Sequence, residues 1–155
     1  MDEKTFFDSY LTDDNLVYLE NETIRIGVNL SLGGALTYLA EKGKKNLINS
    51  YDWGRQVQLS FYSGPVPFHP EGTEMGKHWT HTGWNPIQTG DCFFNRAKLV
   101  EHKIEGNTLY VKCIPMQWPL DNVPGDCTFE IWYRLNGPQV EVTARLNNAR
   151  EDKTR

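Results

Sequence analysis

The chain has 155 residues, of which 39% are hydrophobic and 23% are charged, and its net charge is -4 at pH 7. These values are typical of one globular domain, and a chain of this length buries roughly 70% of the surface of its unfolded form. The scattered Lys and Arg residues argue against a nucleic-acid partner, because a phosphate backbone is bound mainly through clustered basic residues. No apolar run approaches the ~20 residues that span a bilayer, so no membrane partner is expected.

The first fifteen residues are polar and are expected to form an N-terminal arm, because no helical period follows the turn signal at 13–15. Residues 1–7 are acidic and lack the apolar core of a signal peptide. Two compartments therefore stay open. A cytoplasmic location is expected for the chain as written, and a periplasmic or secreted one if a leader has been removed.

Alternating apolar and polar residues predict three strands in the first third of the chain, at residues 16–19, 23–29 and 35–39. The polar turn at 20–22 joins the first two strands into a hairpin. Gly33 and Gly34 permit a bend or bulge before the third strand. Gly43 can adopt positive φ in the turn that follows.

The stretch from Asn49 to Asp91 contains more aromatic, amide, histidine and glycine residues than a plain scaffold needs. Residues 56–62 alternate, which predicts a strand with its apolar side chains on one face. The opposite face then carries Gln56, Gln58, Ser60 and Tyr62. Planar amides and a ring in a row on a rigid sheet suit a ligand made of hydroxyl groups and C–H faces, which is a sugar.

A proline-rich segment follows this predicted strand. Residues 63–72 contain three prolines and two glycines, so neither a helix nor a central strand is expected there. The continuation with His78, Trp79, His81 and Trp84 is too aromatic for disorder. We therefore expect an ordered loop, from Phe68 to Asp91, packed over a site.

The last third of the chain returns to alternating strands, predicted at residues 97–104, 108–114, 127–135 and 139–146. Gly106-Asn107 and Asn136-Gly137 are hairpin turn signals, and a second proline-bearing loop covers 116–125. Trp132 is assigned to the core. Because no segment has a helical period, the predicted class is all-β, an antiparallel β-sandwich over residues 16–147 with a polar tail at 148–155.

The three cysteines, Cys92, Cys113 and Cys127, are odd in number and irregular in spacing. This pattern fits neither a disulfide framework nor a zinc site, so buried free thiols are expected. A Cys113–Cys127 disulfide between neighbouring strands is the alternative.

Residues 21–39, followed by a Lys/Gly turn, Asn46-Leu-Ile and Asp52-Trp-Gly-Arg55, resemble the opening of galactose mutarotase-like (aldose 1-epimerase-like) β-supersandwich domains. The resemblance implies that the chain is the N-terminal half of such a domain and that Arg55 can reach a sugar pocket. The general base of that family, a glutamate, lies in the C-terminal half, so no residue here inherits its role. Residues 84–91 resemble loops in bacterial proteins of polysaccharide degradation. A half-domain leaves a sheet edge exposed, which predicts a homodimer.

The predicted ligand-binding residues are flat rings, amides and one guanidinium. Arg55 can donate two parallel hydrogen bonds to hydroxyl or carboxylate groups, or it pairs with Asp52 or Asp91 instead. Indole rings offer faces on which pyranose C–H groups stack, and amides distinguish hydroxyl orientations or bond loop backbone. The full predicted set is Trp53, Arg55, Gln56, Gln58, Trp79, Trp84, Asn85 and Gln88, with Trp118 as a further stacking candidate.

The candidates for proton transfer are His69, His78, His81 and Asp91. Imidazole titrates near neutral pH, as sugar ring opening requires, although a loop histidine is more often structural. Asp91 with Glu71 or Glu74 is the only arrangement that resembles a glycosidase pair. The pair His78-x-x-His81 lacks a third ligand, so neither a metal nor a cofactor is predicted.

Three functions remain open from the sequence. The first is a carbohydrate-binding domain of the mutarotase-like type. The second is a sugar-processing enzyme, an epimerase or part of a glycoside hydrolase or lyase, that is active only when a C-terminal half or partner completes it. The third is an interaction domain without a ligand, because exposed aromatic patches also mark protein interfaces.

Overall fold

The structure is a computed structural model that describes residues 16–48, 57–62, 74–80, 86–149 and 151. Every strand pair in it is antiparallel, which confirms the predicted all-β sandwich class. The described elements are β1 (Leu16–Glu20), β2 (Ile24–Asn29), the 3-10 turn η2 (Leu30–Leu32), β3 (Ala35–Glu41), β4 (Ser60–Tyr62), β5 (Pro86–Gln88), β6 (Lys98–Glu105), β7 (Thr108–Ile114), β8 (Met116–Gln117), β9 (Cys127–Asn136) and β10 (Gln139–Asn148). Within these ranges no helix has the length and apolar character that crossing a membrane requires.

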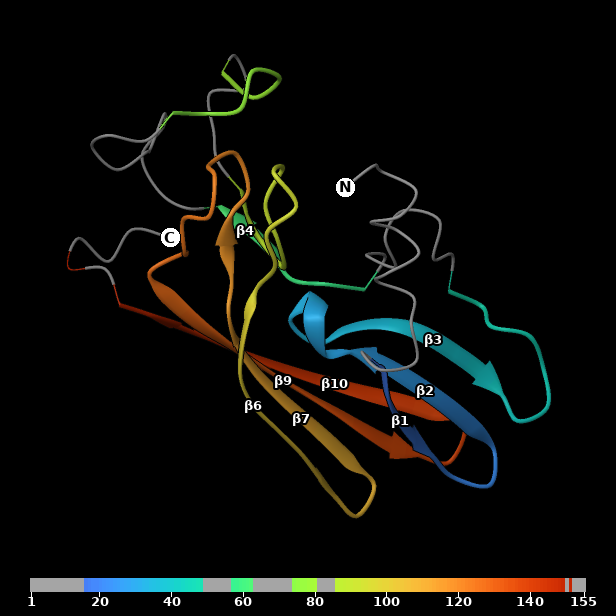
Figure 1. Cartoon of the computed structure of the whole chain (residues 1–155). Helices are drawn as coiled ribbons and strands as arrows, with labels where there is room; N and C mark the ends of the chain where they lie inside the picture. The colour runs from blue at the N-terminus through green and yellow to red at the C-terminus, as the bar shows by residue number, and fades with distance from the viewer. Residues whose placement is uncertain (1–15, 49–56, 63–73, 81–85, 150, 152–155) are drawn as a thin grey trace.

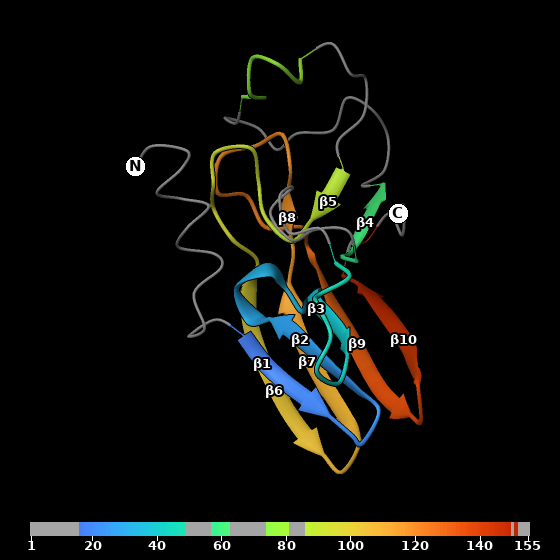
Figure 2. The same ribbon diagram turned by 90° about the vertical axis from the view of Figure 1, so that its right-hand side faces the viewer.

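The strands form three sheets, with the orders β1-β2-β3, β10-β9-β7-β6 and β4-β5-β8. The first two sheets face each other as two layers, and the small sheet β4-β5-β8 lies beyond one end of them (Figure 1, Figure 2). The hairpin turns β1–β2, β6–β7 and β9–β10 gather at the opposite end.

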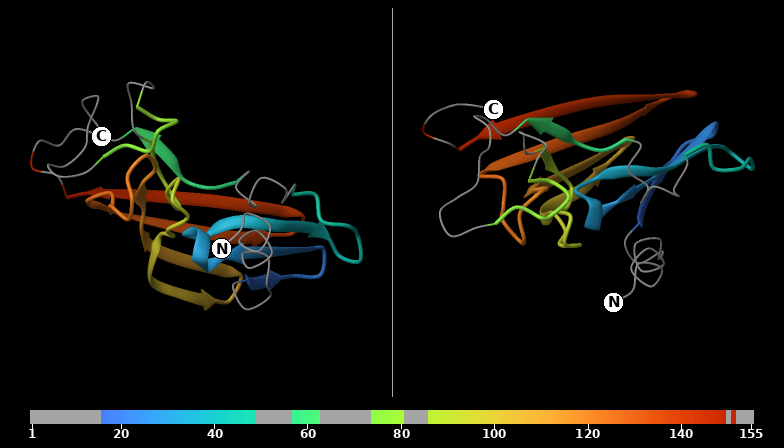
Figure 3. Two further views of the ribbon diagram at one scale, coloured as in Figure 1. Left: turned by 45° about the horizontal axis from the view of Figure 1, so that its top comes forward. Right: turned by 90° about the horizontal axis from the view of Figure 1, so that it is seen from above.

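Figure 3 shows the two layers from two further directions. The main core is built from side chains of both layers. It takes apolar side chains from both sheets, as the alternation of the strands predicts. Its buried members are Leu19, Ile24, Ile26, Val28, Leu36, Leu109, Val111, Ile131, Tyr133 and Leu135. A second, smaller cluster attaches the small sheet to the four-stranded sheet through Leu59, Ile87, Ala97, Cys113 and Cys127.

The predicted glycine bend packs directly on the four-stranded sheet. Gly33 and Gly34 have φ of 61° and 87°, a backbone conformation that favours glycine. A Cβ added to Gly34 would lie 3.0 Å from Cγ2 of Ile131, so a side chain does not fit there. The Tyr133 hydroxyl donates a hydrogen bond to the Gly34 carbonyl at 2.6 Å, which ties the two layers together.

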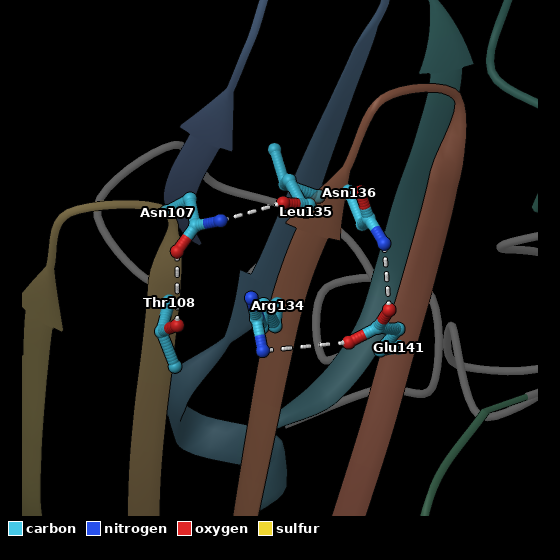
Figure 4. Close-up of polar contacts among 6 residues, drawn as sticks. All are labelled: Asn107, Thr108, Arg134, Leu135, Asn136 and Glu141. Atoms are coloured by element: carbon cyan, nitrogen blue, oxygen red, sulfur yellow. Dashed lines mark hydrogen bonds and ion pairs between the residues drawn. The ribbon is translucent and has the colours of Figure 1, made fainter.

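Asparagines at the hairpin turns bond to neighbouring strands, and the predicted hairpins are confirmed. In Figure 4, Asn107 Nδ2 donates to the Leu135 carbonyl at 2.8 Å and Asn136 Nδ2 donates to Glu141 Oε1 at 2.9 Å. Arg134 lies 3.9 Å from the same Glu141 carboxylate. These contacts fix the ends of β7, β9 and β10 relative to one another.

The predicted strand at 56–62 is shorter than expected. In the part of this prediction that the structure describes, residues 57–62, only Ser60–Tyr62 forms a strand, because β5 ends at Gln88, the residue opposite Ser60. Val57 instead forms an isolated bridge with Leu36 of β3. The short strands β5 and β8 lie in segments that we expected to be loops.

Trp132 is a second correction. Alternation along β9 places it on the face opposite Ile131 and Tyr133, so it is half-buried outside both core clusters. Its ring lies 5.0 Å from that of Tyr110 on the outer face of the four-stranded sheet. The large indole therefore packs against Tyr110 on the outer face of the sheet rather than in the core.

The cysteines are free thiols, as predicted; Cys113 and Cys127 are buried and Cys92 is half-buried. Burial, followed by the neighbouring Cys127, raises the pKa of Cys113 to about 12. The predicted arm at 1–15 lies outside the described residues, and the domain boundaries stay predictions.

Candidate functional site

The structure describes Gln58, His78, Trp79, Gln88 and Asp91 among the predicted site residues. The other predicted site residues lie outside the described ranges, namely Trp53, Arg55, Gln56, His69, His81, Trp84 and Asn85. The geometry of the candidate site is therefore built from the small sheet β4-β5-β8 and the loops at the same end of the sandwich.

One face of the small sheet carries hydroxyl, amide and ring groups together. Ser60 pairs with Gln88 and Tyr62 pairs with Pro86, and Gln88 Nε2 donates to Ser60 Oγ at 3.2 Å. The backbone N–H of Trp118, just after β8, donates to the Pro86 carbonyl at 2.8 Å. Because opposite residues in an antiparallel pair share a face, Ser60, Tyr62, Gln88 and Trp118 lie on one side, together with the buried Pro86 and Met116. Ser60 and Tyr62 are its exposed members, and we call this side the open sheet face.

Gln58 bonds to the scaffold instead of contributing to the open sheet face. Its Oε1 accepts a hydrogen bond from the hydroxyl of Thr89, a residue that is almost completely buried. This bond joins the segment before β4 to the end of β5. The structure thus places Gln88 on the open sheet face, while Gln58 bonds to the scaffold.

Asp91 is a buried structural acceptor, with only 1% of its surface exposed. Its Oδ1 accepts from the backbone N–H groups of Phe93 and Asn95, both at 2.9 Å. Its Oδ2 accepts from Asn95 Nδ2 and from the N–H of Asn122, both at 2.8 Å. Four donors saturate this carboxylate and join two loops, so we assign Asp91 to loop organisation rather than to proton transfer.

The loop that Asp91 organises presents two phenyl rings to solvent. Phe93 and Phe94 are 41% and 44% exposed. Phe94 also has φ of 75°, a left-handed conformation that is costly for a residue with a Cβ. Strained backbone of this kind persists where the surroundings impose it, and it often marks a functional surface.

Two indole rings lie beside this loop. Trp79 and Trp118 meet edge to face, with ring centroids 5.7 Å apart and planes at 88°. Gly76 lies close to Phe93 and Trp79, because a Cβ built on it would be 3.4 Å from Cζ of Phe93 and 3.5 Å from Cδ1 of Trp79. We call Trp79, Phe93 and Trp118, together with the exposed Phe94 that follows Phe93 in the chain, the aromatic loop cluster.

Backbone hydrogen bonds hold the segments of this cluster together. The N–H of Gly76 donates to the Pro119 carbonyl and the N–H of Cys92 donates to the Trp118 carbonyl, both at 2.8 Å. Polar side chains surround the rings: His78 is exposed next to Trp79, and Asn95 Nδ2 donates to the exposed Asp121 at 2.9 Å. The cluster is thus a preformed surface with a polar rim.

Phe93 and Phe94 were missed by reasoning from the sequence. The signal that marks them is the phrase Asp91-Cys-Phe-Phe-Asn95, in which two turn-forming residues flank two rings. Asp91 was one of the candidates for proton transfer and one of two alternative partners for Arg55, which lies outside the described residues; its buried carboxylate bonds to Asn95 and to the backbone of two loops.

A second cluster covers the outer face of the four-stranded sheet. The Tyr110 hydroxyl donates to Glu130 Oε1 at 2.9 Å, and Asn147 Nδ2 donates to Glu130 Oε2 at 2.7 Å. These two bonds hold the pKa of Glu130 below its ordinary value, although burial opposes them. Burial, then the bond to Glu130, raises the pKa of Tyr110 to about 12. Arg145 lies 3.8 Å from the same carboxylate and 5.4 Å from the Trp132 ring centre.

Within the described ranges, no three His, Cys, Asp or Glu side chains converge on a point where a metal ion would sit. Comparison of the chain with protein-family models, with curated proteins and with solved structures finds no match. The functional argument therefore rests on the geometry of the residues themselves.

Proposed function

We propose that this protein is a carbohydrate-binding β-sandwich domain that binds its ligand on the aromatic loop cluster and the adjoining open sheet face. The observation that carries the proposal is the exposed pair Phe93 and Phe94, which lie in the loop that the buried Asp91 ties together, with the Phe93 ring close to Gly76 and Trp79. A preformed surface of this kind binds without a large ordering cost.

The chemistry of the two surfaces matches a sugar. Flat rings bury the C–H faces of a pyranose, while hydroxyl and amide groups exchange hydrogen bonds with its hydroxyl groups. Trp118 belongs to both surfaces, so a ligand that stacks on it is within reach of Tyr62 and of the Ser60–Gln88 pair. An oligosaccharide, rather than a monosaccharide, is the ligand class that suits two adjoining surfaces.

Membership in the mutarotase-like supersandwich type is part of this proposal. Asn46, in the phrase on which the resemblance rests, accepts from the N–H groups of Leu39 and Ile48 and donates to the Thr37 carbonyl. These bonds hold the segment after β3 along that strand. They supply a structural reason for an asparagine at this position.

Binding without turnover is favoured over catalysis because Asp91 is saturated by four donors. Polarimetry on a freshly dissolved α-sugar tests the enzymatic alternative. An unchanged rate of optical relaxation on adding the protein supports a binding domain, and acceleration shows an epimerase.

The proposal is tested by a glycan array followed by titration of tryptophan fluorescence with the selected oligosaccharide. Phe93→Ala and Phe94→Gly should each weaken binding about tenfold or more, since burial of a phenyl ring is worth about 1.5–3 kcal/mol. Phe94→Gly also relieves the left-handed strain, so its free energy of unfolding should stay within about 1 kcal/mol of the wild-type value.

The matched control is Leu47→Ala, which removes an exposed apolar side chain, 75% accessible, from the turn after β3. This variant should bind normally. The carbohydrate proposal fails if no glycan perturbs the fluorescence, or if Leu47→Ala weakens binding as much as the phenylalanine variants. Binding of a protein partner instead, lost in the same variants, would identify the surface as an interaction site.

A further inference from the structure

The strand β10 is an open edge of the four-stranded sheet among the strands that the structure describes. It pairs with β9 over all ten of its residues without a register shift. The opposite edge, β6, has a register shift between Leu99 and Glu101, a bulge that protects an edge against further pairing. Of the two edges, the regular strand β10 is therefore better suited than β6 to pair with another strand.

The two faces of β10 differ sharply in character. Val140, Val142, Ala144 and Leu146 lie opposite core residues of β9 and share their face. Val142 is nevertheless 49% exposed and Leu146 is 39% exposed. The other face carries only polar side chains, namely Gln139, Glu141, Thr143, Arg145 and Asn147.

We propose that a second copy of this chain pairs antiparallel with β10, about a two-fold axis at Thr143. A two-fold axis perpendicular to the sheet keeps the faces of both copies aligned, so it must pass through a residue that pairs with itself. With the axis at Thr143, Val142 meets Ala144 of the second copy, Val140 meets Leu146, and Gln139 meets Asn147. Glu141 meets Arg145 twice, once on each side of the axis.

Other registers do not place Glu141 opposite Arg145. An axis at Glu141 or at Arg145 places two like charges opposite each other, which is destabilising. An axis at Val142 or at Ala144 pairs neither charge with an opposite one. The axis at Thr143 also aligns the largest part of the strand, from Gln139 to Asn147.

The charges inside one chain continue across the proposed interface. Along one row of the outer face, acidic and basic side chains alternate from strand to strand in the order Glu101, Lys112, Glu130 and Arg145. Glu141 of the second copy, already paired with its own Arg134, is the next member that this alternation requires. Charge complementarity therefore selects a second copy as the occupant of the edge.

Light scattering after size-exclusion chromatography, over a micromolar to millimolar range, should show a dimer. Glu141→Lys and Arg145→Glu each create two like-charged pairs at the interface, so each variant alone should raise the dissociation constant about tenfold or more. An equimolar mixture of the two variants should dimerise again, because both cross-strand pairs are then attractive.

Glu101→Lys on β6 is the matched control and should leave the dimer intact. Circular dichroism and thermal unfolding identify any variant that fails to fold. In that event Thr143→Cys in a Cys92→Ser background gives a second readout, because the two introduced thiols lie opposite each other and should form a disulfide-linked dimer. The control variant Lys103→Cys on β6 should not form a disulfide-linked dimer.

The proposal is overturned if the wild-type chain stays monomeric over this concentration range. It is also overturned if the mixture of variants stays monomeric, or if the dimer is insensitive to both charge reversals. Loss of the dimer in Glu101→Lys would place the interface at β6 instead.

Discussion

Asp91 shows how one buried charge can organise a surface that it does not itself form. Its two carboxylate oxygens accept four hydrogen bonds, from Phe93, Asn95 and Asn122, and so connect the loop after β5 with the loop after β8. The rings of Phe93 and Phe94 project outward as a consequence. Sequence reasoning offered this carboxylate as a candidate for proton transfer or for an ion pair with Arg55.

Replacement of Asp91 by asparagine tests this structural role. An amide keeps one acceptor oxygen but turns an NH₂ group toward donors, so the free energy of unfolding should fall by about 1–3 kcal/mol, measured by urea denaturation. Asp126→Asn, at an exposed position with φ of 51°, should change stability by less than about 0.5 kcal/mol. Equal stability of the two variants would contradict the assignment.

At the scale of elements, local sequence pattern predicts the long strands, whereas the bounds of the short strands depend on pairing with distant segments. The hairpins β6–β7 and β9–β10 were predicted from alternation and turn residues alone, because each strand has seven or more residues and a strong local pattern. The short strand β5 has no such pattern and lies in a segment that we expected to be a loop, and β4 covers only the last three residues of the alternating stretch 56–62. The pairing of β4 with β5 is a contact between distant segments of the chain.

We expect stability to depend on pH through Glu130, which lies on the outer face of the four-stranded sheet. The pKa of Glu130 is lowered in the folded state, chiefly by hydrogen bonds from Asn147 and Tyr110. Its contribution to stability is therefore present above the unfolded pKa, about 4.3, and is lost as the pH falls through the folded pKa. Wild type should lose more stability than Glu130→Gln between about pH 6 and pH 3.

Urea denaturation at a series of pH values measures this difference. Glu22→Gln, at an exposed position in the turn between β1 and β2, provides the control and should keep the wild-type pH profile. If Glu130→Gln shows the same acid-side loss as wild type, the hydrogen bonds at Glu130 do not contribute to stability.

At the scale of the whole molecule, the two core clusters share the four-stranded sheet. The larger cluster joins it to β1-β2-β3, and the smaller one joins it to the small sheet through Cys113 and Cys127. A thiol buried between sheets becomes accessible only when those sheets separate. The cysteines are therefore natural reporters of how the molecule opens.

Alkylation of the native protein near neutral pH should modify Cys92 first, and slowly, because burial followed by the charge of Asp91 raises its pKa to about 11. Cys113, fully buried, should react only at the rate of global unfolding. Mass spectrometry of labelling against time in increasing urea measures both rates, and a Cys92→Ser variant isolates the buried thiols. Equal labelling rates at Cys92 and Cys113 in native protein would contradict this order.

The sequence by itself determined the all-β class, the glycine bend, the hairpins and the free thiols, because each depends on alternation, turn chemistry or cysteine number within a short stretch. The site that it predicted between Asn49 and Asp91, from the density of rings and amides, stays a prediction. Only the tertiary structure decided that Asp91 is buried, that Trp132 lies on the outer face, and that Phe93 and Trp118 each lie near Trp79. These positions depend on contacts between segments far apart in the chain, which no local pattern encodes.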